Sequence, residues 1–317
     1  MLRGYLGRRL AAIVPVLFGV SVVIFLLMHL APGDVTTVLL GPQATEQDRV
    51  ALRHTLGLDQ PLPVQYGRWL ERTAEGDLGT SIATSLPVTD LILPRFVNTI
   101  ILTVASLFLA ILIGYSAGLF AALHARSWFD RGMMTVTLIF GSTPPFWLGL
   151  LLVLLFALKL NWLPVSGMID MAGDGGVIDT LHHLVLPAVT TALAPAAIIA
   201  RMVRSSILES LGRPHVLVAR AKGLRRRDLM RRHVVLNALP PIMTITGLQL
   251  GYLLGGALFS EVVFAWPGLG SLLYSSITAR DMPVVQAATM LIALTFVLVN
   301  ILVDLVNVLI DPRLQES

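Results

Sequence analysis

Apolar runs long enough to cross a lipid bilayer recur along this chain of 317 residues. A membrane-spanning helix needs about 20 consecutive apolar residues, because it rises about 1.5 Å per residue through a hydrocarbon layer about 30 Å thick. Only 13% of the residues are charged, whereas about 25% is usual in soluble domains. The sequence therefore predicts an all-α polytopic membrane protein with six transmembrane helices, at residues 10–30, 97–123, 133–160, 183–206, 237–262 and 284–310.

Lys and Arg gather on one side of this predicted topology. Ten of the 23 basic residues lie between Arg201 and Arg232, where only Glu209 and Asp228 are acidic. Residues 161–182, on the opposite side, hold three acids and no basic residue. Because cytoplasmic flanks of membrane helices are enriched in Lys and Arg, we place the 201–232 segment and both termini in the cytoplasm. The basic residues lie in loops between apolar spans, so we reject nucleic acid as a partner.

The first apolar run follows three arginines, Arg3, Arg8 and Arg9. A secretory signal has an apolar core of about 7–15 residues and a small-residue cleavage site. The run at 10–30 is longer and ends without such a site, so we expect a retained first helix, with a twin-arginine export signal as the alternative. The chain has no cysteine, which excludes disulfides and thiolate metal sites.

Residues 31–96 are too long for a simple turn between the first two spans. Helical patterns at 46–56 and 64–73 favour an ordered cap on the outer face over a mobile linker, and Tyr66, Trp69 and Leu70 give it apolar side chains to bury. After the fifth span, the amphipathic residues 271–280 predict a short interfacial helix.

Proline, glycine and polar residues mark special points within the spans. Two adjacent prolines in Thr143-Pro144-Pro145-Phe146-Trp147 predict a break in the third span, because proline lacks the backbone donor that continues a helix. Gly247, Gly251 and Gly255 share one face of the fifth span, where we expect a neighbouring helix to approach closely.

Polar groups at membrane depth are functional candidates, because burying them in lipid is costly. Asp304 shares a helical face with Asn300 and Asn307 near the inner end of the sixth span, where a structural role is favoured over a transport role. The candidate pathway or gate residues are Pro144, Pro145, Gln249, Glu261 and Asp304.

Three kinds of functional site are excluded because the sequence patterns that they require are absent or lie in the wrong structural context. Neither Lys159 nor Lys222 stands in a phosphate-binding Gly-x-x-x-x-Gly-Lys-Ser/Thr pattern, so no nucleotide site is expected. His182-His183 has no carboxylate partner at metal-ligand spacing, so no metal site is expected either. The Gly-x-Ser-x-Gly pattern around Ser116 falls within the second span rather than at a strand-to-helix turn, so we assign its small residues to helix packing.

The basic segment carries a pattern beyond its charge. Residues 219–224 form a short helical run closed by Gly223, which suits a helix C-terminus, and Arg225 opens a second helical piece leading to Pro240. We expect two short helices with their small residues outward, a surface that fits a groove on a partner protein. Arg204 and Arg232, nearest the bilayer, are interpreted as orientation charges.

These residues resemble the cytoplasmic coupling loop of permease subunits in binding-protein-dependent ABC importers, specifically the dipeptide, oligopeptide and nickel group. The resemblance rests on the loop residues Ala219 to Leu224, Arg232-His233 and Asn237-Ala238-Leu239-Pro240. It extends along the chain through the motifs Ala31-Pro32-Gly33-Asp34, Leu56-Gly57-Leu58-Asp59-Gln60-Pro61-Leu62, Gly76-Asp77-Leu78-Gly79, Phe146-Trp147-Leu148-Gly149, Trp162-Leu163-Pro164, Trp266-Pro267-Gly268-Leu269-Gly270, Arg280-Asp281-Met282-Pro283-Val284 and Asp311-Pro312-Arg313.

The resemblance implies a type I ABC importer permease fold in a bacterial inner membrane. The implied division is an N-terminus and first helix at 1–30, an extracytoplasmic cap at 31–96, a five-helix core at 97–310 that includes the coupling loop 207–236, and a cytoplasmic tail at 311–317. The implied coupling residues are Gly212, His215, Ala219, Arg220, Ala221, Lys222, Gly223 and Leu224. The family's Glu-Ala-Ala stands here at Leu217, Val218 and Ala219, of which only the last agrees.

The implied partners are a second six-helix permease, two ATP-binding subunits and an extracytoplasmic substrate-binding protein. ATP and Mg are expected on the ATP-binding subunits, and this chain is expected to bind no cofactor and to catalyse no reaction. The expected cargo is a di- or oligopeptide, with nickel or a metal chelate as the alternative. The rival class is an ion-coupled secondary transporter that uses Asp304 or Glu261 as its proton site.

Overall fold

A computed structural model describes residues 2–30, 36, 40–41, 43–55, 57–170 and 175–310. The predicted motif at 31–34 and the predicted tail at 311–317 lie outside these residues, and so do the side chains of Arg3, Arg8, Arg9 and Asn307. Most of the described residues are helical. Thr80 and Pro87 pair with each other in an isolated antiparallel bridge. The chain divides into two compact units, one of Asn98–Gly270 with Phe296–Ser317 and residues 1–2, the other of Arg3–Val97 with Ser271–Thr295.

The helices occur where the apolar pattern places them, with longer ends. The predicted first, second, fourth, fifth and sixth spans correspond to α1 (Leu2–Leu30), α5 (Val88–Leu123), α8 (Val177–Leu211), α11 (Leu236–Val263) and α13 (Met282–Ile310). The predicted interfacial helix is α12 (Leu269–Ala279). Among the described residues, four helices are long and apolar enough to cross a membrane, or five if one bent pair counts as a span. The described apolar part of α1, Ile13–Leu27, is shorter than this criterion requires.

The predicted break in the third span is confirmed, but it divides that span into two separate pieces. The first piece is α6 (Trp128–Ser142), and the second is α7 (Pro145–Leu152) continued by the π-helical segment η1 (Val153–Lys159); the two are bent by 105°. Thr143 and Pro144 both adopt extended backbone, with ψ of 129° and 128°, and α7 starts at Pro145. The proline pair explains the break, because neither ring nitrogen can donate to the preceding turn.

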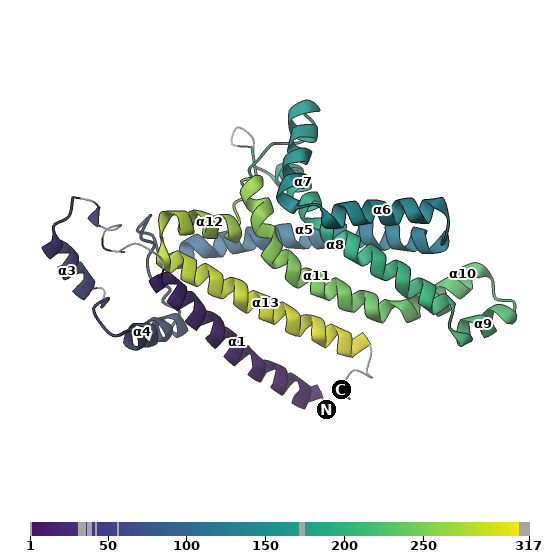
Figure 1. The fold of residues 1–317 in the computed structure, drawn as a ribbon, viewed down its shortest axis with the longest axis horizontal. Coiled ribbons are helices and arrows are strands. Elements are labelled where there is room, and N and C mark those ends of the chain that lie inside the picture. Colours follow the sequence, from purple (N-terminus) through teal and green to yellow (C-terminus); the bar gives the residue numbers. More distant parts are fainter. Residues whose placement is uncertain are drawn as a thin grey trace. The chain divides into compact units, whose positions relative to one another are not determined.

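In the first unit, α8 is the helix that the others pack around. It packs against α6, α7 and α11, and Figure 1 shows α8 and α11 running side by side. Helix α5 approaches α8 at Gly114 and Gly118, where an added Cβ would lie only 2.7 Å from Ala196 O and 2.4 Å from Ala200 O. This contact confirms the packing role assigned to the small residues around Ser116, which lies within a continuous helix.

Two of the three glycines in α11 serve the predicted close packing. An added Cβ would lie 2.2 Å from Val303 Cγ1 at Gly247 and 3.0 Å from the Phe296 ring at Gly251, both on α13. At Gly255 nothing lies within 4 Å, so the prediction is wrong for that position within the described chain. The reason is geometric, because three glycines at four-residue spacing drift around the helix and leave the face of a single neighbour.

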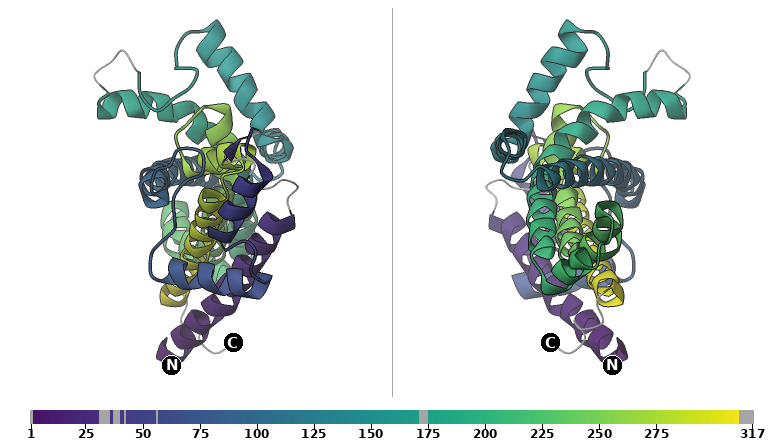
Figure 2. Two further views of the ribbon diagram at one scale, coloured as in Figure 1. Left: turned by 90° about the vertical axis from the view of Figure 1, so that its left-hand side faces the viewer. Right: turned by 90° about the vertical axis from the view of Figure 1, so that its right-hand side faces the viewer.

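The second unit contains the ordered segment predicted between the first two spans. Its helices are α3 (Glu46–Thr55) and α4 (Leu62–Ala74), which match the predicted helical patterns. Helix α4 lies against α1 (Figure 2), with Tyr66 Oη 2.7 Å from Ser21 Oγ and its ring centroid 5.3 Å from that of Phe25. The Trp69 ring packs on both Phe25 and Tyr66. Tyr66, Trp69 and Leu70 are half-buried, so the expected burial of these side chains is only partial.

Polar caps fix the ends of other helices in the second unit. The Thr45 hydroxyl and amide donate to the Asp48 carboxylate at the start of α3, and these bonds hold the pKa of Asp48 below its ordinary value. Asp281, only 3% exposed, precedes α13 and accepts hydrogen bonds from the Ser81 hydroxyl and from the Ile82 amide at 3.0 Å. The predicted motifs at 76–79 and 280–284 therefore meet in this unit, with Gly79 next to Pro283.

Candidate functional site

The basic segment between α8 and α11 contains two helical pieces, as predicted, but the first begins five residues before the predicted run at 219–224. The first is α9 (Pro214–Ala221), and the second comprises α10 (Arg226–Leu229) and the π-helical segment η2 (Met230–Val235), which continue into α11. Pro214 occupies the first turn of α9, where its missing N–H costs nothing because that donor would have no helical partner. Gly212 caps the C-terminus of α8.

Gly223 ends α9 as predicted from the sequence. Its φ is +79°, and its amide donates to Arg220 O at 3.0 Å. Leu224 N reaches Ala219 O at 3.4 Å, so two of the last carbonyls of the helix are satisfied. An added Cβ at Gly223 would meet nothing within 4 Å, so backbone conformation rather than lack of space requires glycine here.

One side of α9 is anchored in the chain's own core. Val216 and Ala219 are 2% and 8% exposed, and both belong to a cluster with Leu229, Val234 and Ala238. The expectation that Ala219 faces outward is therefore wrong, because α9 needs an apolar face to pack on the ends of α8 and α11. Below this cluster the Ser210 hydroxyl, on α8, donates to Val234 O at 3.1 Å.

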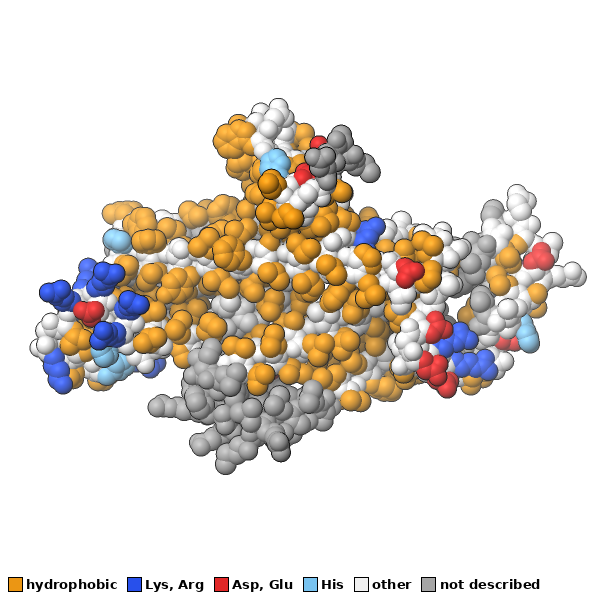
Figure 3. All heavy atoms as spheres, turned by 180° about the vertical axis from the view of Figure 1, so that it is seen from behind, with side chains coloured by type: hydrophobic (Ala, Val, Ile, Leu, Met, Phe, Trp, Pro, Cys, Tyr) orange, Lys and Arg blue, Asp and Glu red, His pale blue; other side chains and the backbone are white. Residues whose placement is uncertain are grey.

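The opposite side of α9 is open. The implied coupling residues His215, Arg220, Ala221, Lys222 and Gly223 are exposed, and Leu224 is half-buried. Leu217 and Val218 are 54% and 55% exposed, although both are apolar. Sequence reasoning noted these two positions only as departures from the family pattern; their helical offset from the buried Val216 and Ala219 was the signal that places them outward. Figure 3 shows Lys and Arg side chains gathered at the end of the molecule where α9 and α10 lie.

A partly buried ion pair near this loop was not predicted. Arg204 of α8 donates from Nε and Nη2 to the two carboxylate oxygens of Asp130 on α6, at 2.6 Å and 2.7 Å. The Asp130 side chain is 3% exposed and that of Arg204 is 29% exposed. Such a bidentate contact fixes orientation as well as charge. Arg204, interpreted from the sequence as an orientation charge, therefore joins α6 to the helix that leads into α9.

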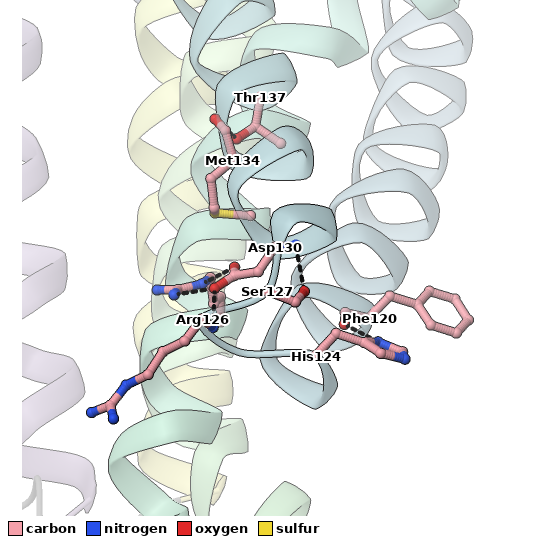
Figure 4. A network of polar contacts seen from close by, with 8 residues as sticks. Phe120, His124, Arg126, Ser127, Asp130, Met134 and Thr137 are labelled. Atoms are coloured by element: carbon pink, nitrogen blue, oxygen red, sulfur yellow. Dashed lines mark hydrogen bonds and ion pairs between the residues drawn. The ribbon is translucent and has the colours of Figure 1, made fainter.

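The turn before α6 is organised by the same carboxylate (Figure 4). The Asp130 carboxylate accepts a third hydrogen bond from the Arg126 amide at 2.9 Å, and Arg126 has a φ of +67°. The Ser127 hydroxyl accepts from the Asp130 amide at 3.2 Å and caps α6. The geometry thus couples the end of α5, the start of α6 and the C-terminal part of α8 through one acidic residue.

Glu261, a candidate pathway residue, is completely buried and held by its own chain. Its Oε1 accepts from the Thr99 hydroxyl and its Oε2 accepts from the Gly270 amide, both at 2.6 Å. Thr99 Oγ1 in turn accepts from the Leu269 amide at 2.8 Å. An added Cβ at Gly268 would lie 2.2 Å from the carboxylate, so the motif 266–270 wraps tightly around it.

The other candidate pathway residues are not brought to Glu261 by any described contact. Pro144 and Pro145 form the break between α6 and α7, Gln249 lies on α11, and Asp304 is half-buried on α13. Gln249 is 8% exposed, and its Oε1 accepts no hydrogen bond within the described residues. A gate built from these residues stays a prediction.

The paired histidines do have a carboxylate neighbour, contrary to the prediction. His183 Nδ1 lies 3.1 Å from Asp179 Oδ1, one turn earlier in α8. No group of three or more His, Cys, Asp or Glu side chains able to hold a metal ion occurs within the described part of the chain. The pair is therefore a local contact at the start of α8.

Sequence comparisons identify relatives along the whole chain. A family model described as the binding-protein-dependent transport system inner membrane component matches residues 110–316, and a model of the N-terminal part of such membrane components matches residues 1–103. The chain is 40% identical over 329 residues to the dipeptide transport system permease protein DppB of Alkalihalophilus pseudofirmus, covering 98% of this chain and 99% of the relative. It is 40% identical over 311 residues to the glutathione transport system permease protein GsiC of Escherichia coli K12, covering 98% of each.

Solved structures share the fold at low sequence identity. An inward-facing form of the MetNI methionine ABC transporter matches with a TM-score of 0.56 and 20% identity over 67% of this chain and 93% of the matched chain. An amino acid ABC transporter with histidines matches with a TM-score of 0.51 and 19% identity over 69% and 94%. At this identity the likeness concerns the arrangement of helices.

Proposed function

This chain belongs to the family of binding-protein-dependent transport system inner membrane components, and from this premise we propose that it forms half of a translocation pathway for di- or oligopeptides. It is a non-catalytic permease subunit of an ABC importer, and the ATPase activity of such an importer sits in partner subunits. The observation that carries the mechanism is the two-sided helix α9, whose Val216 and Ala219 are buried while Leu217 and Val218 are exposed.

The open side of α9 is the proposed seat for an ATP-binding subunit. Its two exposed apolar side chains stand beside the small residues Ala221 and Gly223, a combination that lets a short helix enter a groove closely. The charges of Arg220 and Lys222 surround this patch and favour an acidic rim on the partner. A membrane-facing role for Leu217 and Val218 is less favoured, because ten basic residues crowd the same segment.

The buried side of α9 is the proposed transmission element. The cluster around Val216 joins α9 to both long helices that flank the loop, and the Ser210–Val234 hydrogen bond joins α8 to η2, which continues into α11. A displacement of α9 by its partner is then passed to α8 and α11 as a rigid-body motion. ATP binding shifts the permease only if the partner contacts α9 differently in its two states, since equal affinity for both states shifts nothing.

The membrane topology proposed here has six spans, with both termini and the coupling loop 207–236 in the cytoplasm. The 31–96 segment forms the extracytoplasmic cap, 97–310 the core, and 311–317 a cytoplasmic tail. The assembly is a heterodimer with a second six-helix permease, served by two ATP-binding subunits that hold ATP and Mg and by a substrate-binding protein. The ten basic residues between Arg201 and Arg232 and the acidic 161–182 segment support this orientation.

A peptide cargo is supported by the dipeptide and glutathione permeases at 40% identity over nearly the whole chain. Nickel or a metal chelate remains the alternative within the same family. A proton-coupled carrier that uses Glu261 as its proton site is disfavoured because both oxygens of Glu261 accept hydrogen bonds from the chain itself. That rival predicts accumulation by this chain alone in vesicles, blocked by a protonophore, whereas the importer predicts none without its partners.

The test of coupling to the ATP-binding subunit compares two glycines that have the same backbone conformation and the same free space around an added Cβ. Gly223 and Gly76 both have positive φ, +79° and +88°, and an added Cβ at either meets nothing within 4 Å. In the assembled transporter, Gly223→Trp is expected to abolish uptake and substrate-stimulated ATP hydrolysis while membrane insertion persists, and Gly76→Trp is expected to retain most of both. Normal stimulated hydrolysis in Gly223→Trp refutes the proposed seat.

A further inference from the structure

We propose that the pocket between the end of α5 and α10 binds the headgroup of an anionic phospholipid. This pocket has a volume of about 500 Å³ and is lined by Leu123, His124, Arg226, Arg227 and Met230. Two arginines and a histidine thus line the same space as a leucine and a methionine. A volume of this size holds a phosphate ester together with its glycerol, since small-molecule sites range over about 300–1,000 Å³.

The lining matches the two halves of a lipid molecule. Arginine presents a planar set of N–H donors that binds phosphate oxygens in pairs, and two adjacent arginines supply two such sets. Leu123 and Met230 offer apolar surface for the first carbons of the acyl chains. Arg226 is already directed toward α5, since its Nη2 lies 3.5 Å from Leu123 O. Asp228, the acidic neighbour on α10, is not among the lining residues.

The surroundings place the pocket at the level where lipid headgroups lie. On the α5 side, Phe120 is 51% exposed, and directly after the pocket residues Trp128 and Phe129 are 84% and 50% exposed. The Arg131 guanidinium stands 5.3 Å from the centre of the Trp128 ring. Exposed tryptophan next to arginine is typical of the membrane–water boundary, where aromatic rings meet headgroups.

A lipid is favoured over an acidic side chain of a protein partner for a reason of position. The pocket residue Leu123 ends α5, a helix long and apolar enough to cross a membrane, and Phe108 of this helix is 64% exposed, so lipid is the expected neighbour of the pocket. The proposed protein seat lies on another element, the open side of α9. Basic pockets of this kind beside membrane helices bind anionic headgroups in a salt-dependent manner.

The decisive measurement is lipid retention by the transporter purified with its partner subunits, in native mass spectrometry after incubation with phosphatidylglycerol or phosphatidylcholine. The wild type is expected to retain phosphatidylglycerol preferentially. Arg226→Gln with Arg227→Gln is expected to weaken this binding about 10- to 30-fold, because each basic group near an anionic surface contributes to affinity. Arg231→Gln with Arg232→Gln removes the same charge from residues outside the pocket and is expected to change binding less than about threefold.

A second variant distinguishes lipid binding in the pocket from general electrostatic attraction of anionic lipid to the basic surface. Leu123→Trp fills the pocket without removing charge, and its folding is checked by thermal unfolding of the same complex; it is expected to lose phosphatidylglycerol as the double arginine variant does. Full retention by Leu123→Trp, or equal losses in the two double variants, overturns the proposal. So does displacement of the lipid by equimolar glycerol 3-phosphate, or loss of the ATP-binding subunits rather than of lipid in the Arg226/Arg227 variant.

Discussion

The carboxylate of Asp130 receives both the Nε and the Nη2 hydrogen bonds of Arg204, 74 residues later in the chain. This contact joins α6 to α8 close to the loop that carries α9. Asp130 also holds the turn from α5 into α6 through the Arg126 amide. Loss of this one side chain therefore leaves a partly buried cation without a partner and releases a turn whose backbone has positive φ at Arg126.

Asp130→Asn is expected to lower the free energy of unfolding by about 2–3 kcal/mol, because the remaining guanidinium loses its charged partner in a partly buried place. The measurement is denaturant-induced unfolding of the purified chain in detergent. Arg213→Gln is the matched control, since its partner Glu209 is 70% exposed and such pairs contribute less than about 1 kcal/mol. Equal effects of the two changes would contradict the role given to Asp130.

Gly247→Ala and Gly255→Ala are expected to act in opposite directions, although both lie in α11. At Gly247 the new methyl would lie 2.2 Å from Val303 Cγ1, so α11 and α13 must separate, at a cost of about 1–3 kcal/mol. At Gly255 the methyl enters open space, and alanine stabilises a helix by about 0.5–1 kcal/mol relative to glycine. Unfolding of the chain purified without partners measures both, and destabilisation of similar size at the two sites would show that the α11–α13 contact is not as described.

Thr99→Val is expected to destabilise the turn around Glu261 by about 2–3 kcal/mol, because it leaves Glu261 Oε1 and the Leu269 amide without the hydroxyl that joins them. Thr99→Ser keeps the hydroxyl and is expected to cost less than about 1 kcal/mol. Thermal unfolding compares the pair. If serine proves as damaging as valine, the lost methyl rather than the hydrogen bonds explains the effect.

The positions of the long helices could be predicted from the sequence because a membrane span must be long and apolar. Both properties can be read from a continuous run of residues without knowledge of the tertiary structure. The break at Pro144 and the end of α9 at Gly223 were equally local, since each depends on the backbone of one or two residues. The number of membrane spans was harder to predict from the sequence. A 105° bend turns one apolar run into two pieces, and no pattern in residues 133–160 specifies that angle.

The site was predicted only where its residues are neighbours in the chain. Residues 219–224 were found because they are consecutive and include the end of α9, whereas the outward face of that helix depends on the side chains of α8 and α11 that pack beneath it. The partners of Glu261 divide in the same way: Gly270 is nine residues away and Thr99 is 162 away. Pairings across such separations are set by tertiary packing, which composition and spacing leave open.

An added Cβ at Gly223 meets nothing within 4 Å in this chain. The backbone cost of a substitution there can therefore be measured separately from its steric cost. Left-handed backbone costs an ordinary residue about 1–2 kcal/mol, and the chain itself exacts no further steric penalty there. A mirror-image alanine, introduced by chemical ligation, avoids even the backbone cost and places its methyl group at the other substituent position of the same Cα. Whatever transport such a protein loses is then a direct reading of how closely another molecule approaches that point.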